Sequence, residues 1–150
     1  MSRKCSIRKI SQLPTIKGFK PFGWCTDEIS NIKLSLEEYE VLRLLDYEKL
    51  NQEEAAPRMN ISRPTLTRIY ETCRKKIAEA FIEGKAIIIE GGNVEFNEEW
   101  YQCEKCHHII KRHAESISAS CPVCESDQLF SINKCYFNQC DKCRKCQKNL

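Results

Sequence analysis

The sequence has no hydrophobic run that approaches the roughly 20 residues a membrane-spanning helix needs. Its basic N-terminus has neither a long apolar core nor a cleavage site, so no secretory signal is predicted. A Ser/His/Asp set, a Gly-rich phosphate loop and a paired-carboxylate signature are also missing. We therefore expect a cytoplasmic protein that has no membrane partner and is not an enzyme.

The chain also lacks a strong excess of either charge, since 24 Lys and Arg stand against 21 Asp and Glu, a formal net charge of +3. Its 150 residues predict one domain or two small ones. Eleven cysteines are the exception to an ordinary composition. In a cytoplasmic chain they favour metal binding over disulfides. Because the formal net charge is small, the overall charge of the chain neither supports nor excludes a nucleic-acid partner.

The stretch from Asn51 to Gly84 predicts a helix, a tight turn and a longer helix. Asn51 is a good N-cap, and Glu54 can return the contact as in a capping box. Asn60 tolerates the left-handed conformation that a sharp turn needs. Ser62 then caps the second helix, which Gly84 ends as a natural stop.

One face of the second helix is apolar and the opposite face is polar. At about 100° per residue, Arg68 and Lys75 lie opposite a stripe that includes Leu66, Cys73 and Ile77. Docked by this stripe, the helix would present Arg and small hydroxyl residues to a major groove. The candidate DNA contacts are Gln52, Arg63, Thr65, Thr67, Arg68, Thr72 and Lys75. An ordinary helical hairpin with a solvated basic face is the alternative.

The sequence QEEAAPRMNISRPTLTRI resembles the helix-turn-helix of a small, uncharacterised family of prokaryotic proteins expected to bind DNA. That motif is similar to sigma factor region four. The resemblance covers roughly residues 3–93 and includes FKPFG, SLEEYEVLRLLDYEKL and EGKAIIIEGG. It implies a tri-helical DNA-binding domain. The chain departs from the family pattern at Pro57, where a helix former is usual, and at Asn60 and Thr67, where glycine is usual.

The remaining elements complete a predicted domain over residues 1–92. Ser35 and Glu38 form a capping box for a helix over 35–48. The apolar run 86–89 reads as a strand, with 94–96 returning as its hairpin partner. The N-terminal segment is a basic arm that would follow phosphates, enter the minor groove or stay solvated. Cys5 and Cys25 have no close cysteine partner. The fold class predicted here is mainly α, a tri-helical helix-turn-helix domain with a short β-hairpin.

The second predicted domain, 93–150, is a cysteine-rich, β-rich metal module. Two CxxC pairs, Cys103 with Cys106 and Cys121 with Cys124, are separated by 14 residues. Zinc needs four ligands at tetrahedral corners, and each CxxC pair supplies two from one tight turn. With flanking strands, the pattern predicts a structural zinc ribbon over 100–132. The histidines His107, His108 and His113 are expected to be surface or packing residues.

The tail carries a second group of cysteines over residues 135–146. These are Cys135, Cys140, Cys143 and Cys146. Four close thiolates favour a second zinc. An iron–sulfur cluster is the alternative, because the x₂–x₂ rhythm matches part of a ferredoxin run but lacks the following Cys-Pro. A redox-active or disordered tail is left open as well.

These patterns together predict a sequence-specific transcriptional regulator that binds double-stranded DNA and carries a structural zinc ribbon. Its tail would either respond to metal or redox state or hold a purely structural zinc. One alternative is a zinc-ribbon adaptor that binds RNA polymerase or another protein. The other is an iron–sulfur or redox protein. A homodimer is compatible with each of them.

Overall fold

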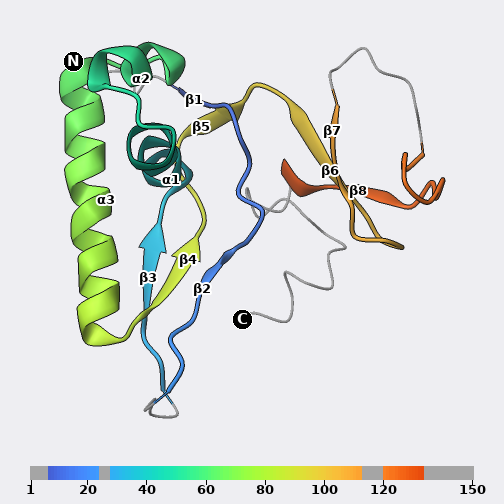
Figure 1. The fold of residues 1–150 in the computed structure, drawn as a ribbon, viewed down its shortest axis with the longest axis horizontal. Coiled ribbons are helices and arrows are strands. Elements are labelled where there is room, and N and C mark those ends of the chain that lie inside the picture. Colours follow the sequence, from blue (N-terminus) through green and yellow to red (C-terminus); the bar gives the residue numbers. More distant parts are fainter. Residues whose placement is uncertain (1–6, 24–27, 113–119, 134–150) are drawn as a thin grey trace. The chain divides into compact units, whose positions relative to one another are not determined.

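The computed structural model describes residues 7–23, 28–112 and 120–133 (Figure 1). The chain separates into two compact units, Met1–Glu95 and Phe96–Leu150. The described helices are α1 (Leu36–Leu42), its π-helical continuation η1 (Arg43–Tyr47), α2 (Gln52–Arg58) and α3 (Arg63–Glu83). The described strands are β1 (Arg8–Ile10), β2 (Gly18–Phe19), β3 (Asn31–Leu34), β4 (Ala86–Ile89), β5 (Val94–Phe96), β6 (Glu99–Cys103), β7 (Ile109–Arg112) and β8 (Leu129–Ser131).

The fold class is mixed α/β, so the prediction of a mainly α protein is wrong. Of the described residues, 36% are helical and 24% are in strands. The strands form three small sheets, ordered β1-β5, β2-β4-β3 and β7-β6-β8. The N-terminal segment, which sequence patterns left as an arm, supplies three of these strands and accounts for most of the difference.

The helices begin and end where their capping residues predicted. Ser35 and Asn51 each accept a hydrogen bond from the backbone N–H three residues on, in complete capping boxes. Ser62 caps α3 by accepting a hydrogen bond from the backbone N–H of Thr65. Asn60 has φ 56°, so it makes the left-handed turn between α2 and α3. Gly84, with φ 64°, ends α3 in the left-handed region that favours glycine.

The three helices enclose a small hydrophobic core. Its buried members are Val41, Leu44, Ala55, Ala56, Met59 and Leu66. Leu66 and Cys73 anchor the buried side of α3. Burying one large aliphatic side chain contributes about 1.5–3 kcal/mol, so a few such residues suffice to fix α3 against α1 and α2. The opposite side of α3 is thereby held toward solvent.

The predicted hairpin between 86–89 and 94–96 does not form. Strand β4 instead lies at the centre of a mixed sheet, antiparallel to β2 and parallel to β3. Strand β5 pairs with β1. A Cβ atom at Gly18 would lie 2.0 Å from the carbonyl oxygen of Ile87, so glycine is required where β2 approaches β4. The partners of β4 were missed because they lie far away in the sequence.

The N-terminal segment is fixed to the helices by a buried polar network. Glu40, which is 1% exposed, accepts hydrogen bonds from the backbone N–H and the hydroxyl of Ser11, at 3.0 and 2.5 Å. Arg43 donates to both oxygens of Glu40 at 2.9 Å and pairs with Glu48. Lys9 donates its N–H to the carbonyl of Met59 at 3.1 Å. The segment after β1 is therefore held against α1, and β1 lies beside the turn before α3.

Buried Cys73 makes folding stability sensitive to alkaline pH. Burial, helped by Glu38 and Asp46, raises the pKa of its thiol to about 12. An unfolded cysteine ionises near pH 8.5, so the stabilisation is complete below that pH and is lost between about 8.5 and 12. We expect Cys73→Ala to lose less stability than wild type across this window. Urea unfolding followed by helical circular dichroism at pH 7 and pH 10 checks this; equal losses in both proteins would contradict it.

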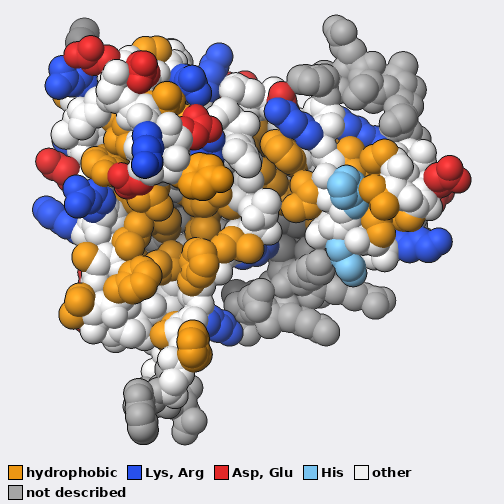
Figure 2. Space-filling model, in the orientation of Figure 1, with side chains coloured by type: hydrophobic (Ala, Val, Ile, Leu, Met, Phe, Trp, Pro, Cys, Tyr) orange, Lys and Arg blue, Asp and Glu red, His pale blue; other side chains and the backbone are white. Residues whose placement is uncertain are grey.

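Part of the first unit's surface is apolar. Figure 2 shows hydrophobic side chains gathered over the region of β3 and β4. Exposed large hydrophobic residues around β2 and β3 include Ile16, Phe19 and Ile29.

None of the helices formed by the described residues is both long enough and apolar enough to cross a membrane.

Candidate nucleic-acid interface and metal centre

The exposed face of α3 brings together most of the predicted DNA contacts. Arg63, Arg68, Thr72 and Lys75 are exposed, whereas Thr65 and Thr67 are half-buried at its two flanks. Gln52, at the start of α2, is half-buried beside them. Figure 2 shows Lys and Arg side chains among acidic ones along the α3 side of this unit. The packing that buries Leu66 and Cys73 turns this basic face outward.

One flank of α3 is joined to α2 through polar side chains. The hydroxyl of Thr67 lies 2.9 Å from Oε1 of Gln52, to which it donates. Because this bond occupies the oxygen of Gln52, the amide group keeps its two N–H donors for another partner. Arg63 forms an exposed ion pair with Glu53 at 3.2 Å. Such a pair contributes little to stability, so it opposes a new contact of Arg63 only weakly.

The basic residues of α3 differ in how far they are already paired. Lys76 donates to Glu38 at 2.8 Å, and Arg74 lies over the ring of Tyr70 at 5.4 Å. Arg68 and Lys75 make no ion pair with any residue that the structure describes. These two cations on the outer face of α3 are therefore the ones best able to meet an anionic partner.

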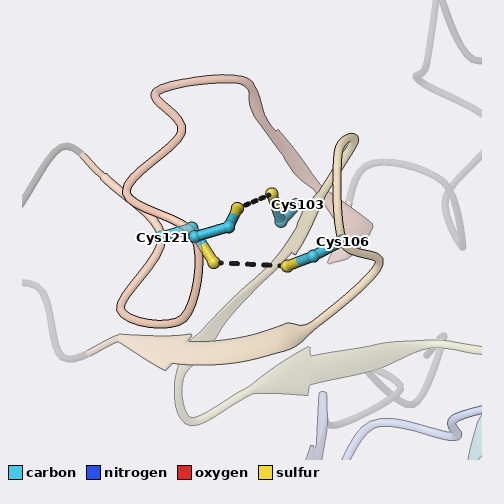
Figure 3. Close-up of side chains that lie close together, drawn as sticks. Cys103, Cys106 and Cys121 are labelled. Atoms are coloured by element: carbon cyan, nitrogen blue, oxygen red, sulfur yellow. Dashed lines mark hydrogen bonds between the residues drawn. The ribbon is translucent and has the colours of Figure 1, made fainter.

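The four cysteines of the two CxxC pairs form one cluster in the second unit (Figure 3). Their sulfur atoms all lie within 4.8 Å of one another. Cys103 and Cys124 are 3.5 Å apart, and Cys106 and Cys121 are 3.6 Å apart. Four sulfurs around zinc, each at about 2.3 Å, would be about 3.8 Å from one another. The cluster can therefore hold a metal ion with little adjustment.

The two CxxC turns have the same backbone design. His107 and Glu125, the residues after each second cysteine, have φ of 59° and 58°. Each donates its N–H to the carbonyl of the first cysteine in its turn, at 3.0 Å to Cys103 and 2.9 Å to Cys121. Strand β6 delivers Cys103, and β7 and β8 pair with β6 on its two edges. The three-stranded sheet and the two equivalent turns thus position all four sulfurs.

Hydrogen bonding prepares part of the cluster for ionisation. The backbone N–H of Cys106 lowers the pKa of the Cys103 thiol to about 6, although burial of the thiol opposes this shift. The N–H of His108 acts in the same direction on Cys106, but burial and the other three cysteines outweigh it and raise that pKa to about 12. Ionising one of four close thiols disfavours ionising the next unless a cation is present. The donor set is therefore chemically suited to a divalent metal.

Several predicted residues lie outside the described ranges. They are Cys5, Cys25, His113 and the tail cysteines Cys135, Cys140, Cys143 and Cys146. His107 and His108 are described and are exposed. Sequence reasoning missed a hollow beside α3, of about 380 Å³, which Arg8, Ser35 and Glu37 help to line. Thr65, Arg68 and Thr72, which were predicted DNA contacts, also line it, but nothing in the sequence placed Arg8 or the start of α1 beside them.

Comparison with known proteins confirms the uncharacterised family that the sequence resembles. The model of the family described as "Protein of unknown function DUF134" matches residues 1–97. The chain belongs to this family. Its match covers every element from β1 to β5, and thus the whole of the α3 face described above.

Other members of the family are similar over both units of the chain. A UPF0251 protein of Chloroherpeton thalassium is 41% identical over 129 residues, covering 86% of this chain and 85% of its own. A UPF0251 protein of Clostridium novyi is 38% identical and covers 99% of both chains. A third, from Halothermothrix orenii, is 39% identical over 85% of this chain and 98% of its own. No solved structure matches.

Proposed function

We propose that this protein is a transcriptional regulator that binds double-stranded DNA through α3. The observation that carries the proposal is the outer face of α3, where Arg68 and Lys75 are exposed without ion pairs. An α-helix with its side chains is about 10–12 Å across, and the major groove of DNA is about 12 Å wide. A helix fixed by its buried side can therefore enter the groove with its basic face first.

The neighbouring helix supports this docking. Asn51 and Glu54 fix the start of α2, and Gln52 lies beside Thr67 on α3. With its oxygen occupied by Thr67, the amide of Gln52 can donate to a phosphate at the groove edge. Phosphate contacts from α2 would fix the register of α3, as in helix-turn-helix proteins.

The second unit is proposed to hold one structural zinc through Cys103, Cys106, Cys121 and Cys124. The paired sulfurs lie close to the tetrahedral spacing, and soft thiolates select zinc readily. Four cysteines would close the coordination shell and leave no position for a catalytic water. The metal would therefore supply folding energy rather than chemistry.

Lys75 tests the DNA contact directly. We expect Lys75→Ala to weaken binding to all duplexes alike and to reduce the salt slope by about one, because a phosphate contact is independent of sequence. Fluorescence anisotropy with metal-replete protein at several salt concentrations measures both quantities. Lys85→Ala is the matched control, because Lys85 follows the far end of α3 and is paired with Glu79 and Glu83.

A failure of DNA binding would change the proposed class. If metal-replete wild-type protein bound no duplex at low salt, the basic face of α3 would be a solvated surface. The adaptor that binds RNA polymerase or another protein would then be the better proposal. Equal effects of Lys75→Ala and Lys85→Ala would instead mean that only net charge matters.

A further inference from the structure

A hollow of about 380 Å³ lies on the flank of α3 that faces away from α2. Its polar lining consists of Arg8 and Arg68, of Glu37 and Glu38, and of the hydroxyl residues Ser35, Thr65 and Thr72. These residues come from β1, from the start of α1 and from the first half of α3. Three hydroxyl groups and two guanidinium groups therefore meet in one depression beside the proposed DNA-binding face.

The two carboxylates of the hollow are already occupied by protein donors. Glu37 pairs with Arg8 at 2.6 Å and accepts the N–H of Asn93 at 3.1 Å. Glu38 pairs with Lys76 and accepts the N–H of Ser35, both at 2.8 Å. Each negative charge thus faces a cation at close range. The guanidinium of Arg68 is left as the excess charge of the hollow.

Donors in the hollow are available for an anion. Arg68 makes no ion pair with the residues that the structure describes. Nε of Arg8 is buried and has no hydrogen-bond acceptor among the described residues. The hydroxyl oxygen of Ser35 accepts from the N–H of Glu38, which leaves its own proton to donate. A group with several acceptor oxygens and one negative charge matches this set.

The hollow lies on the flank of α3 that would face one wall of the major groove. At about 100° per residue, Thr65 and Thr72 lie on one flank of α3, whereas Thr67 lies on the opposite flank beside Gln52. A helix inserted in the major groove has a phosphate backbone on each side. We propose that the hollow is a phosphate site. It binds a backbone phosphate of the DNA strand opposite the strand that Gln52 contacts. This inference rests on the proposed function and assigns Arg68 to phosphate, not to a base edge.

Two substitutions of Ser35 test the phosphate site without removing the cap of α1. Asp, Asn and Ser are about equally good N-caps, so Ser35→Asp and Ser35→Asn should both fold. Ser35→Asp places a negative charge in the hollow, whereas Ser35→Asn is its neutral match. Relative to Ser35→Asn, we expect Ser35→Asp to bind duplex DNA at least tenfold more weakly at low salt. Equal affinities of the two variants for duplex DNA would overturn the proposed phosphate site.

Arg68 distinguishes phosphate from base contact. Arg68→Ala should weaken all duplexes by a similar factor and reduce the salt slope by about one. Relaxed preference at a single base pair, with an unchanged slope, would overturn the assignment. A single methylphosphonate scanned along one strand should reproduce the loss in wild type and leave Arg68→Ala unaffected at the same position. If the wild type bound no DNA, the proposed function would be refuted. If the wild type bound DNA and the variants bound it equally well, only the phosphate site would be refuted.

Discussion

Replacement of Cys121 with serine is expected to remove about one equivalent of zinc and to unfold the second unit. Among its described residues the three strands β6, β7 and β8 are short, and Cys103 and Cys121 are among the most deeply buried side chains. A small domain with so little core depends on its metal for much of its folding energy. Metal analysis of the Cys121→Ser protein should show the lost equivalent, and limited proteolysis should cleave within residues 100–132. Residues 35–84 should stay helical, since their core is separate.

His107 supplies the control for this experiment. It is exposed and follows Cys106 directly, so it tests whether any substitution beside the cluster releases metal. Asn tolerates the left-handed conformation of this position, where φ is 59°. His107→Asn should therefore keep the full zinc content. Unchanged zinc in Cys121→Ser would rule out the site, and lost zinc in His107→Asn would show a ligand other than the four cysteines.

Replacement of Arg43 with methionine is expected to destabilise the first unit by about 3–5 kcal/mol, because it leaves Glu40 as a buried charge without its cation. Glu40 is 1% exposed and the side chain of Arg43 is 9% exposed. Ser11 would remain as a hydrogen-bond donor to Glu40, but it carries no charge. Urea unfolding of zinc-loaded protein, followed by the helical signal, measures the loss.

A double substitution separates the lost pair from the lost packing. Arg43→Met with Glu40→Leu removes both charges and keeps most of the volume, so it should recover much of the stability. A loss below about 1 kcal/mol in the single variant would show that the pair behaves like an exposed one. No recovery in the double variant would show that Ser11 and the segment after β1 depend on the ion pair itself.

Local signals in the sequence determined the parts of the fold that were predicted well. Asn51, Ser62 and Gly84 act within one helical turn, so their effect can be read from neighbouring residues. The two CxxC turns are local as well, and their sulfurs meet as the spacing indicated. That the metal is zinc, and that α3 binds DNA, remain predictions.

Nonlocal pairing explains the parts that could not be predicted. Strand β4 joins β2 and β3, and nothing in the run 86–89 indicates partners so far away in the chain. A hairpin with 94–96 was the nearest choice, but β5 pairs with β1 instead. The hollow has the same origin, because Arg8 and Thr72 meet only after the sheet and helices have assembled. The spacing of residues in the sequence does not indicate such long-range contacts.

The parallel pairing of β3 with β4 should also govern how fast the first unit folds. Asn31 lies opposite Ala86, about 55 residues away, with all three helices between them. Three-helix bundles, which rely on local contacts, fold in microseconds to milliseconds. Here the chain must close a long loop before the sheet contributes any stability. We therefore expect the helices to collapse first and the strands to join late, as the slow step that completes the domain.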